Sequence, residues 1–198
     1  MFNLLRYKEV FKSISGLWIG SLAGSGSTFL IYIILSRNIS LDQFGIFGST
    51  IAISNMAIIL SGFGISQLWL KIFGKEGWEG VRWIAPSIIL LILTTSFSLV
   101  ILFFWIIWGP HDEITQMVYS IFIFYIIGQV CIQFIYSKLQ LEENYRLISV
   151  LNFLPNFLRL LLIFTVIYIF KENIDLRIIS YIFSLVGVLL SILAFIAI

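Results

Sequence analysis

The chain has 198 residues, of which 60% are apolar and 11% are Lys, Arg, Asp or Glu, and its mean hydropathy is +1.06. This number of charged residues is too small to form the polar shell of a soluble domain. The composition therefore excludes a soluble globular protein and predicts an integral membrane protein. The net charge of +2 is too small to predict a nucleic-acid partner.

Six stretches of the chain are long and apolar enough to cross a bilayer as helices, since about 20 apolar residues span its hydrocarbon core. Long runs such as SIILLILTTSFSLVILFFWIIW do not alternate, as the strands of a transmembrane barrel must. We therefore expect one all-α domain, a bundle of transmembrane helices. The expected spans are residues 14–36, 44–66, 83–108, 114–137, 146–170 and 176–198.

The distribution of Lys and Arg predicts the orientation of the bundle, because cytoplasmic loops collect these residues. The N-terminal segment, the second loop and the fourth loop together hold eight of them, whereas the other three loops hold three. Both termini are therefore expected on the cytoplasmic side. The last span reaches Ile198 without a closing polar segment, so we expect the chain to be part of something larger.

The first span carries small residues at strict four-residue spacing. Gly16, Gly20, Gly24 and Thr28 form one stripe, which predicts close packing against another helix. A second stripe of Ser21 and Ser25 lies beside it and could instead face a wet cavity.

Polar residues also recur along the fourth and sixth spans. Gln129, Gln133 and Ser137 lie four residues apart on one face. A glutamine amide at membrane depth needs a partner, since leaving it unpaired costs about 1 to 3 kcal/mol. The row of Ser180, Ser184, Gly187 and Ser191 in the sixth span instead predicts packing, because serine bonds back to its own backbone.

A single arginine, Arg159, lies near the middle of the fifth span, within LNFLPNFLRLLLIFTVIYIF. Asn152, Pro155 and Asn156 share its side of the helix, and Pro155 removes one backbone hydrogen bond beside it. A central arginine costs about 2.5 to 3.5 kcal/mol on insertion scales, so we expect it to face the bundle interior or a water-filled cavity. We predict that it binds an anion. Snorkelling or pairing with backbone carbonyls would be the alternative.

Nothing in the sequence predicts an enzyme, a metal site or a cofactor. There is no nucleophile and base pair, and GSGST lacks the following residues of a phosphate-binding loop. His111, Asp112 and Glu113 are expected to form a solvated turn rather than a metal site. Cys131, the single cysteine, is expected to be a small buried residue.

Two segments resemble the polysaccharide flippases, the Wzx-like members of the multidrug, oligosaccharidyl-lipid and polysaccharide exporter superfamily. YIILSRNISLDQFGIFGSTIAISNMAIILSGFGISQLWLK follows a small-residue-rich span and contains Arg37 at its outer end, then Gly45, then a Gly-x-Gly at Gly62 and Gly64. QFIYSKLQLEENYRLISVLNFLPNFLRLLL is similar to the fourth-to-fifth helix region of that family. The order and spacing of these motifs carry the resemblance.

The resemblance implies flipping of an undecaprenyl-diphosphate-linked oligosaccharide across a bacterial cytoplasmic membrane, for O-antigen or capsule biosynthesis. Family members have two six-helix lobes around a cationic cavity, and this chain matches only the N-terminal lobe. A second copy of the chain or a second half-transporter would supply the missing lobe. The substrate-binding residues expected on this interpretation are Arg159, Asn156, Asn152, Gln133, Gln129 and Arg37.

Two other functions stay open. A drug or cation exporter of the same superfamily would need a buried acidic residue, and none of the ten Asp and Glu residues lies deep in an expected span. A non-transporting membrane scaffold would depend on the small-residue stripes and would tolerate a neutral residue at Arg159.

Overall fold

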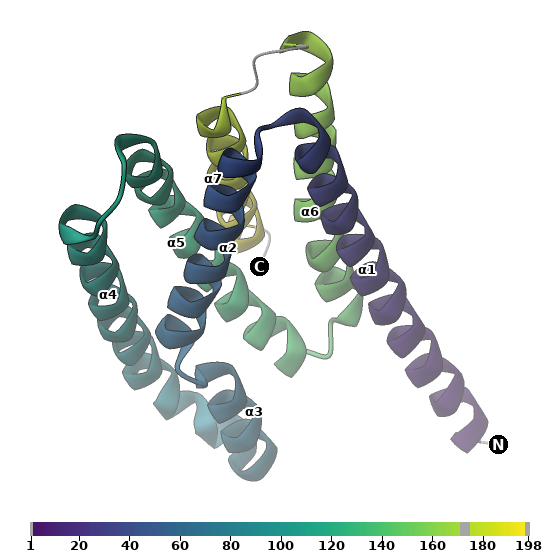
Figure 1. Ribbon diagram of the computed structural model, residues 1–198. Helices are drawn as coiled ribbons and strands as arrows, with labels where there is room; N and C mark the ends of the chain where they lie inside the picture. The colour runs from purple at the N-terminus through teal and green to yellow at the C-terminus, as the bar shows by residue number, and fades with distance from the viewer. Residues whose placement is uncertain (1, 171–174, 197–198) are drawn as a thin grey trace.

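The computed structural model describes residues 2–170 and 175–196, and the side chains of 14–169 and 175–196. The regular elements in these residues are all helices, as predicted (Figure 1). They are α1 (Phe2–Asn38), α2 (Leu41–Gly62), α3 (Ile65–Glu76), a 3-10 segment (Gly77–Trp83), α4 (Ile84–Trp108), α5 (Glu113–Leu141), α6 (Tyr145–Phe170) and α7 (Leu176–Ile196).

Within the described residues, five stretches are long and apolar enough to cross a membrane. One of them, Leu41–Trp108, is folded into α2, α3, the 3-10 segment and α4, with α2 packed against α4. Large apolar side chains such as Ile92, Phe97 and Phe104 on α4 lie on the outside of the molecule, where a soluble protein would place polar residues. These features indicate a multi-pass membrane protein.

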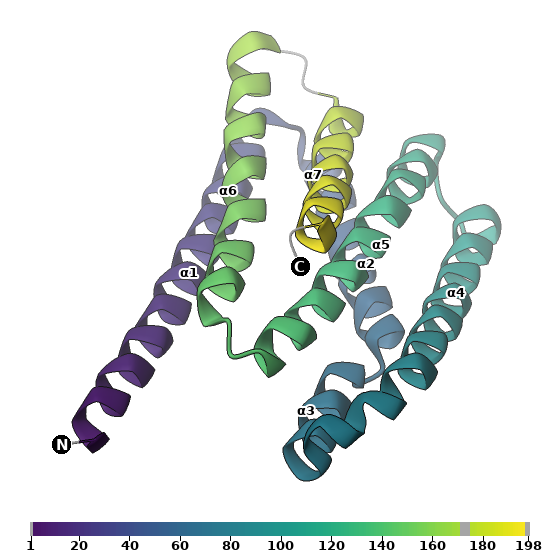
Figure 2. The ribbon, with the colours of Figure 1, turned by 180° about the vertical axis from the view of Figure 1, so that it is seen from behind.

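The helices alternate in direction along the chain (Figures 1 and 2). Helices α1, α4 and α6 run one way, and α2, α5 and α7 run the other way. Two groups of helices are packed most closely: α1 with α6, and α5 with both α7 and α2. Helix α6 also contacts α7 and α5, but over a smaller interface. The end of α1 packs against α2, with the ring of Tyr32 5.9 Å from that of Phe47, and these contacts together join the α1–α6 pair to the remaining helices.

Short helix α3 is a feature that the sequence interpretation missed. The second expected span, 44–66, is displaced toward the C-terminus, because α2 begins at Leu41 and ends at Gly62. Phe63 and Gly64 both have positive φ, 38° and 74°, which ends α2 and turns the chain into α3. Helix α3 then buries Ile65 and Trp69 on one face. A search for runs of about 20 apolar residues passes over a helix of this length.

Aromatic residues form the core where α2, α5 and α7 meet. Phe47 is fully buried, with its ring 5.2 Å from that of Phe183 and 6.4 Å from that of Phe122, both edge-to-face. Tyr125 contacts Phe122 at 5.3 Å. Edge-to-face contacts of this kind add about 0.5 to 1.5 kcal/mol each to the burial of the rings, so the cluster fixes how the three helices pack.

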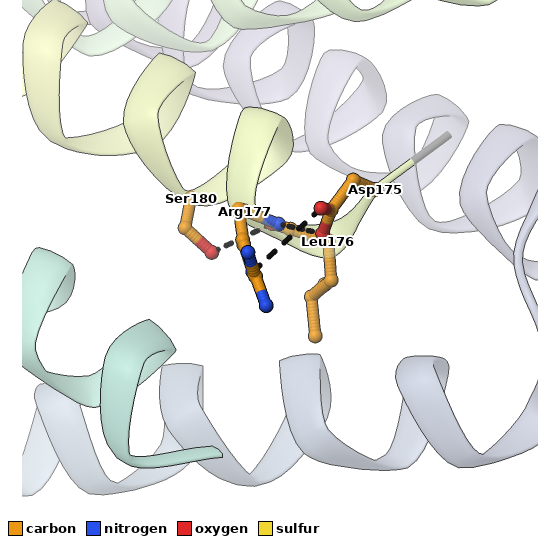
Figure 3. Close-up of polar contacts among 4 residues, drawn as sticks. All are labelled: Asp175, Leu176, Arg177 and Ser180. Carbon is orange, nitrogen blue, oxygen red and sulfur yellow. Dashed lines mark hydrogen bonds and ion pairs between the residues drawn. The ribbon is translucent and has the colours of Figure 1, made fainter. Parts of the chain in front are cut away.

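The start of α7 is capped by Asp175 (Figure 3). Its carboxylate accepts a 2.9 Å hydrogen bond from the backbone N–H of Arg177 and lies 3.6 Å from the Arg177 side chain. Ser180 donates to the carbonyl of Leu176, one turn earlier. A carboxylate at this position accepts from a backbone N–H that has no partner within the helix. Its negative charge also interacts favourably with the positive end of the helix dipole.

Candidate functional site

The side chain of Arg159 lies inside the bundle. It is 3% exposed and comes from the middle of α6, where α6 meets α5 and α7. The prediction that this arginine faces the interior rather than lipid is therefore confirmed. It does not snorkel to either end of the helix, and no hydrogen bond among the described residues joins it to a backbone carbonyl.

The guanidinium group of Arg159 lies between two aromatic rings. Its central carbon is 5.1 Å from the ring centroid of Tyr125 on α5 and 4.9 Å from that of Phe183 on α7. A cation over an aromatic face gains about 2 kcal/mol when both are removed from water. The two rings therefore stabilise a charge that no carboxylate neutralises within the part of the chain that the structure describes.

The hydrogen-bonding capacity of Arg159 is largely unused. Nη1 donates to Oδ1 of Asn156 at 3.3 Å, whereas buried Nε and Nη2 have no acceptor among the described residues. Each buried donor left without an acceptor costs roughly 1 to 3 kcal/mol. An anion that reached these two nitrogens would satisfy both, since they form one edge of the guanidinium fork and can bind two oxygens of a phosphate.

Asn152 and Asn156 connect Arg159 to the small-residue stripe of α1. The Asn156 amide nitrogen donates to the Asn152 carbonyl at 3.2 Å. A Cβ placed on Gly24 would lie 2.5 Å from that carbonyl oxygen and 3.3 Å from the Asn156 amide nitrogen. Only a glycine fits there, so the predicted close packing of this stripe against another helix is confirmed, and the other helix is α6.

The same stripe continues toward the start of α6. Ser149 donates a 2.7 Å hydrogen bond to the carbonyl of Gly16, and a Cβ on Gly20 would lie 2.7 Å from the Ser149 carbonyl oxygen. Ser21 and Ser25, by contrast, are exposed. Ser21 and Asn152 help to line a cavity of about 400 Å³ between α1 and α6.

The second wall of the site depends on a close crossing of α5 and α7. A Cβ on Gly128 would lie 2.7 Å from the carbonyl carbon of Gly187, and Ser184 donates a 2.8 Å hydrogen bond to the Ile121 carbonyl. The small-residue row of α7 thus packs against α5, as expected. Gly187 also lies close to the arginine, since its Cβ would come 3.8 Å from Nη2 of Arg159.

The two glutamines lie apart from the cluster formed by Arg159 and its neighbours Asn156, Asn152, Tyr125 and Phe183. Gln133 extends toward the end of α2, where its Oε1 would be 3.1 Å from a Cβ on Gly62. Ser137, one turn further on, has its Oγ 2.6 Å from that of Ser66 in α3. Gln129 is half-buried, and no hydrogen bond in the described residues joins either glutamine to Arg159.

Arg37 lies outside the cluster as well. It is exposed in the last turn of α1, thirteen residues beyond Gly24, which corresponds to about 20 Å along a helix. The structure therefore brings together Arg159, Asn156 and Asn152 from the expected set. It adds Tyr125 and Phe183, which the sequence interpretation missed because nothing in an apolar run marks which aromatic ring will meet a distant arginine.

Two smaller expectations are wrong. Asp112 and Glu113 are exposed, as expected, but His111 is not solvated with them: it packs 4.3 Å from the ring of Trp105 and 5.4 Å from that of Tyr119. Cys131 is exposed rather than buried. The outer face of a membrane helix is as apolar as its inner face, so an apolar run around a residue does not predict burial.

Comparison of the chain with models of known protein families, with curated proteins and with solved structures found no match.

Proposed function

We propose that this chain forms one lobe of a transporter that moves an undecaprenyl-diphosphate-linked oligosaccharide across the bacterial cytoplasmic membrane, and that Arg159 binds the diphosphate. The observation that carries the proposal is the buried guanidinium of Arg159, whose Nε and Nη2 lack acceptors. The resemblance of the sequence to polysaccharide flippases supports the choice of cargo.

The charge of the site favours an anion over a cation. Arg159 has two aromatic neighbours and an amide neighbour, and no carboxylate of the described residues pairs with it. An exporter of cations would need the opposite charge at such a site. Diphosphate combines two features that this site can use: negative charge and oxygens spaced for paired N–H donors.

The site is closed in this structure, so binding requires movement of helices. The α1–α6 pair is held by the glycine contacts at Gly20 and Gly24, whereas α6 meets α7 and α5 over less surface. Tyr125 and Phe183 cover the guanidinium from the α5 and α7 side. Separation of the α1–α6 pair from α5 and α7 would expose Nε and Nη2 to cargo while each group stays intact.

The membrane arrangement in this proposal has six spans with both termini in the cytoplasm. A lobe of this kind covers only one side of a transport path, so a second copy of the chain or a second half-transporter completes it. Two copies with this topology would lie parallel in the membrane, as the lobes of such exporters do.

A structural role is the second candidate, because Arg159 packs on two rings and is nearly fully buried. On that interpretation the chain is a membrane scaffold and Arg159 holds α6 against α5 and α7. The two candidates differ in one respect: only a transporter site distinguishes a diphosphate from an uncharged lipid alcohol.

The deciding experiment measures binding of undecaprenyl diphosphate and of uncharged undecaprenol to the protein in lipid nanodiscs. The unaltered chain should prefer the diphosphate, Arg159→Gln should lose about tenfold or more of that preference, and Arg159→Lys should keep part of it. Arg146→Gln, which removes a charge from an exposed position at the start of the same helix, is the matched control. Equal binding of the two lipids by the unaltered chain would rule out the diphosphate site.

Export in cells gives an independent measurement. Arg159→Ala should abolish glycan export at normal expression, and Arg159→Lys should restore it in part. Normal export by the alanine variant would remove the reason for assigning the site to cargo.

A further inference from the structure

A second cavity, unrelated to Arg159, lies where α3, the 3-10 segment, α4 and α5 meet. Its volume is about 660 Å³, and its wall is mostly aromatic and aliphatic, including Trp69, Phe73, Trp78 and Phe134. Cavities of several hundred Å³ with such linings hold small apolar molecules. Lys138, which lines it, is thirteen residues from Tyr125, or about 20 Å along α5, so the two sites are distinct.

The inner wall of this cavity is fixed by specific contacts. Trp69 donates a 2.7 Å hydrogen bond from its indole nitrogen to Ser87 at the start of α4. Its ring also packs edge-to-face on Phe134 of α5, at 4.9 Å. These contacts tie three helices together around the cavity, so it exists before any ligand enters.

The surroundings of the cavity are typical of the membrane–water boundary. Helix α3 carries Lys71 and Lys75 on its exposed side, and the 3-10 segment exposes Trp78 and Trp83. Tryptophan rings and lysine side chains concentrate at the level of the lipid headgroups. A molecule in this cavity is therefore placed with one end among hydrocarbon chains and the other among headgroups.

Among the described residues, the charged side chains that line the cavity are Lys138 and Glu142. Lys138 Nζ lies 3.7 Å from Glu142 Oε1, and both side chains are nearly half exposed. Arg82, close by in the 3-10 segment, is paired with Glu76 at 3.0 Å. Because each of these cations has a carboxylate beside it, the charges at the cavity match a zwitterionic headgroup better than an anionic one.

We propose that this cavity binds a zwitterionic aminophospholipid, phosphatidylethanolamine. The acyl chain lies against Phe73, Trp78 and Phe134, the phosphate binds Lys138, and the primary ammonium donates to Glu142. Binding of this lipid would hold α3 and the 3-10 segment at the membrane surface. This inference is independent of the function proposed for Arg159.

Native mass spectrometry of the delipidated protein, incubated with equal amounts of phosphatidylethanolamine and phosphatidylglycerol that have the same acyl chains, tests the proposal. The unaltered chain should retain phosphatidylethanolamine at least threefold more than phosphatidylglycerol. Glu142→Gln should lower the affinity for phosphatidylethanolamine about tenfold, because it removes the acceptor of the ammonium, and should not lower retention of phosphatidylglycerol. Glu143→Gln, the same change at the next residue, should have no effect.

A second variant tests the acyl-chain part of the cavity. Val81 lines the cavity and is 49% exposed, so Val81→Trp should fill the space without removing a buried contact and should abolish retention of phosphatidylethanolamine. Ile101→Trp is the matched control, since Ile101 is 52% exposed on a different apolar groove between α2 and α4. Equal retention of the two lipids by the unaltered chain, or normal retention by Val81→Trp, would overturn the proposal.

Discussion

Asn156 holds Arg159 from one turn away, through a 3.3 Å hydrogen bond between its Oδ1 and Nη1 of the arginine. The same amide donates to the Asn152 carbonyl and lies against Gly24 of α1. Asn156 thus connects the buried charge of Arg159 with a close helix contact of the α1–α6 pair.

Replacement of Asn156 by aspartate tests whether the unpaired charge of Arg159 matters for anion binding. Asn156→Asp places a carboxylate at the position that now accepts from Nη1, so the buried charge becomes paired. We expect the affinity for undecaprenyl diphosphate to fall at least tenfold. Loss of the amide's hydrogen bond to the Asn152 carbonyl offsets the stability gained from the new ion pair, so we expect the melting temperature in detergent to change little. Asn144→Asp, the same change in the turn between α5 and α6, is the control. Undiminished binding by Asn156→Asp would contradict the role given to Arg159.

Because α1 and α6 are in close contact at Gly24, the addition of one methyl group at this position should destabilise the protein. Gly24→Ala forces a Cβ to within 2.5 Å of the Asn152 carbonyl, so the helices must separate, and we expect a loss of about 1 to 3 kcal/mol in the free energy of unfolding. Gly26→Ala makes the same change two residues along, where a Cβ meets nothing within 4 Å. Thermal unfolding of the two variants side by side measures the difference; equal melting temperatures would show that the contact does not stabilise the fold.

A similar pair of variants tests the crossing of α5 and α7. Gly128→Ala places a Cβ 2.7 Å from the Gly187 carbonyl carbon, and Gly48→Ala places one in open space. The first should destabilise the protein by about 1 to 3 kcal/mol, and the second should not. Because Gly187 borders Arg159, Gly128→Ala should also weaken binding of undecaprenyl diphosphate, whereas Gly48→Ala should bind as the unaltered chain does.

The exposed position of Cys131 can be measured without any mutation, because it is the only cysteine in the chain. A nitroxide spin label attached to it should collide readily with oxygen, which concentrates in lipid, and rarely with a water-soluble nickel chelate. That result would place the outer face of α5 in the hydrocarbon region. Frequent collisions with the chelate would instead place Cys131 beside water.

The class of the fold and part of the site could be predicted from the sequence. Helix periodicity places Arg159, Asn156 and Asn152 on one side of α6, because residues three and four apart share a face. The spacing of Gly16, Gly20 and Gly24 likewise predicts a close helix contact. Both patterns can be recognised within a single segment of the sequence.

The parts that could not be predicted depend on contacts between distant segments. Tyr125 and Phe183 reach Arg159 only through the packing of α5 and α7 against α6, and no local pattern encodes that meeting. Helix α3 was missed for a different reason. Its twelve residues form a short amphipathic helix with one buried face and one charged face, and a scan for long apolar runs does not detect such a pattern.

The length of α1 gives the close contact at Gly24 a mechanical consequence. With 37 residues, α1 is about 55 Å long, well beyond the roughly 30 Å of the hydrocarbon core, and Gly24 divides it unequally. Gly16 and Gly20 also contact Ser149 of α6, so the arm beyond these contacts runs from Gly16 back to Phe2 and is about 21 Å long. A tilt of the α1–α6 pair by about 10° moves the far end of this arm by about 4 Å relative to Gly16. A small displacement at the arginine is thereby amplified into a large one at the beginning of the chain.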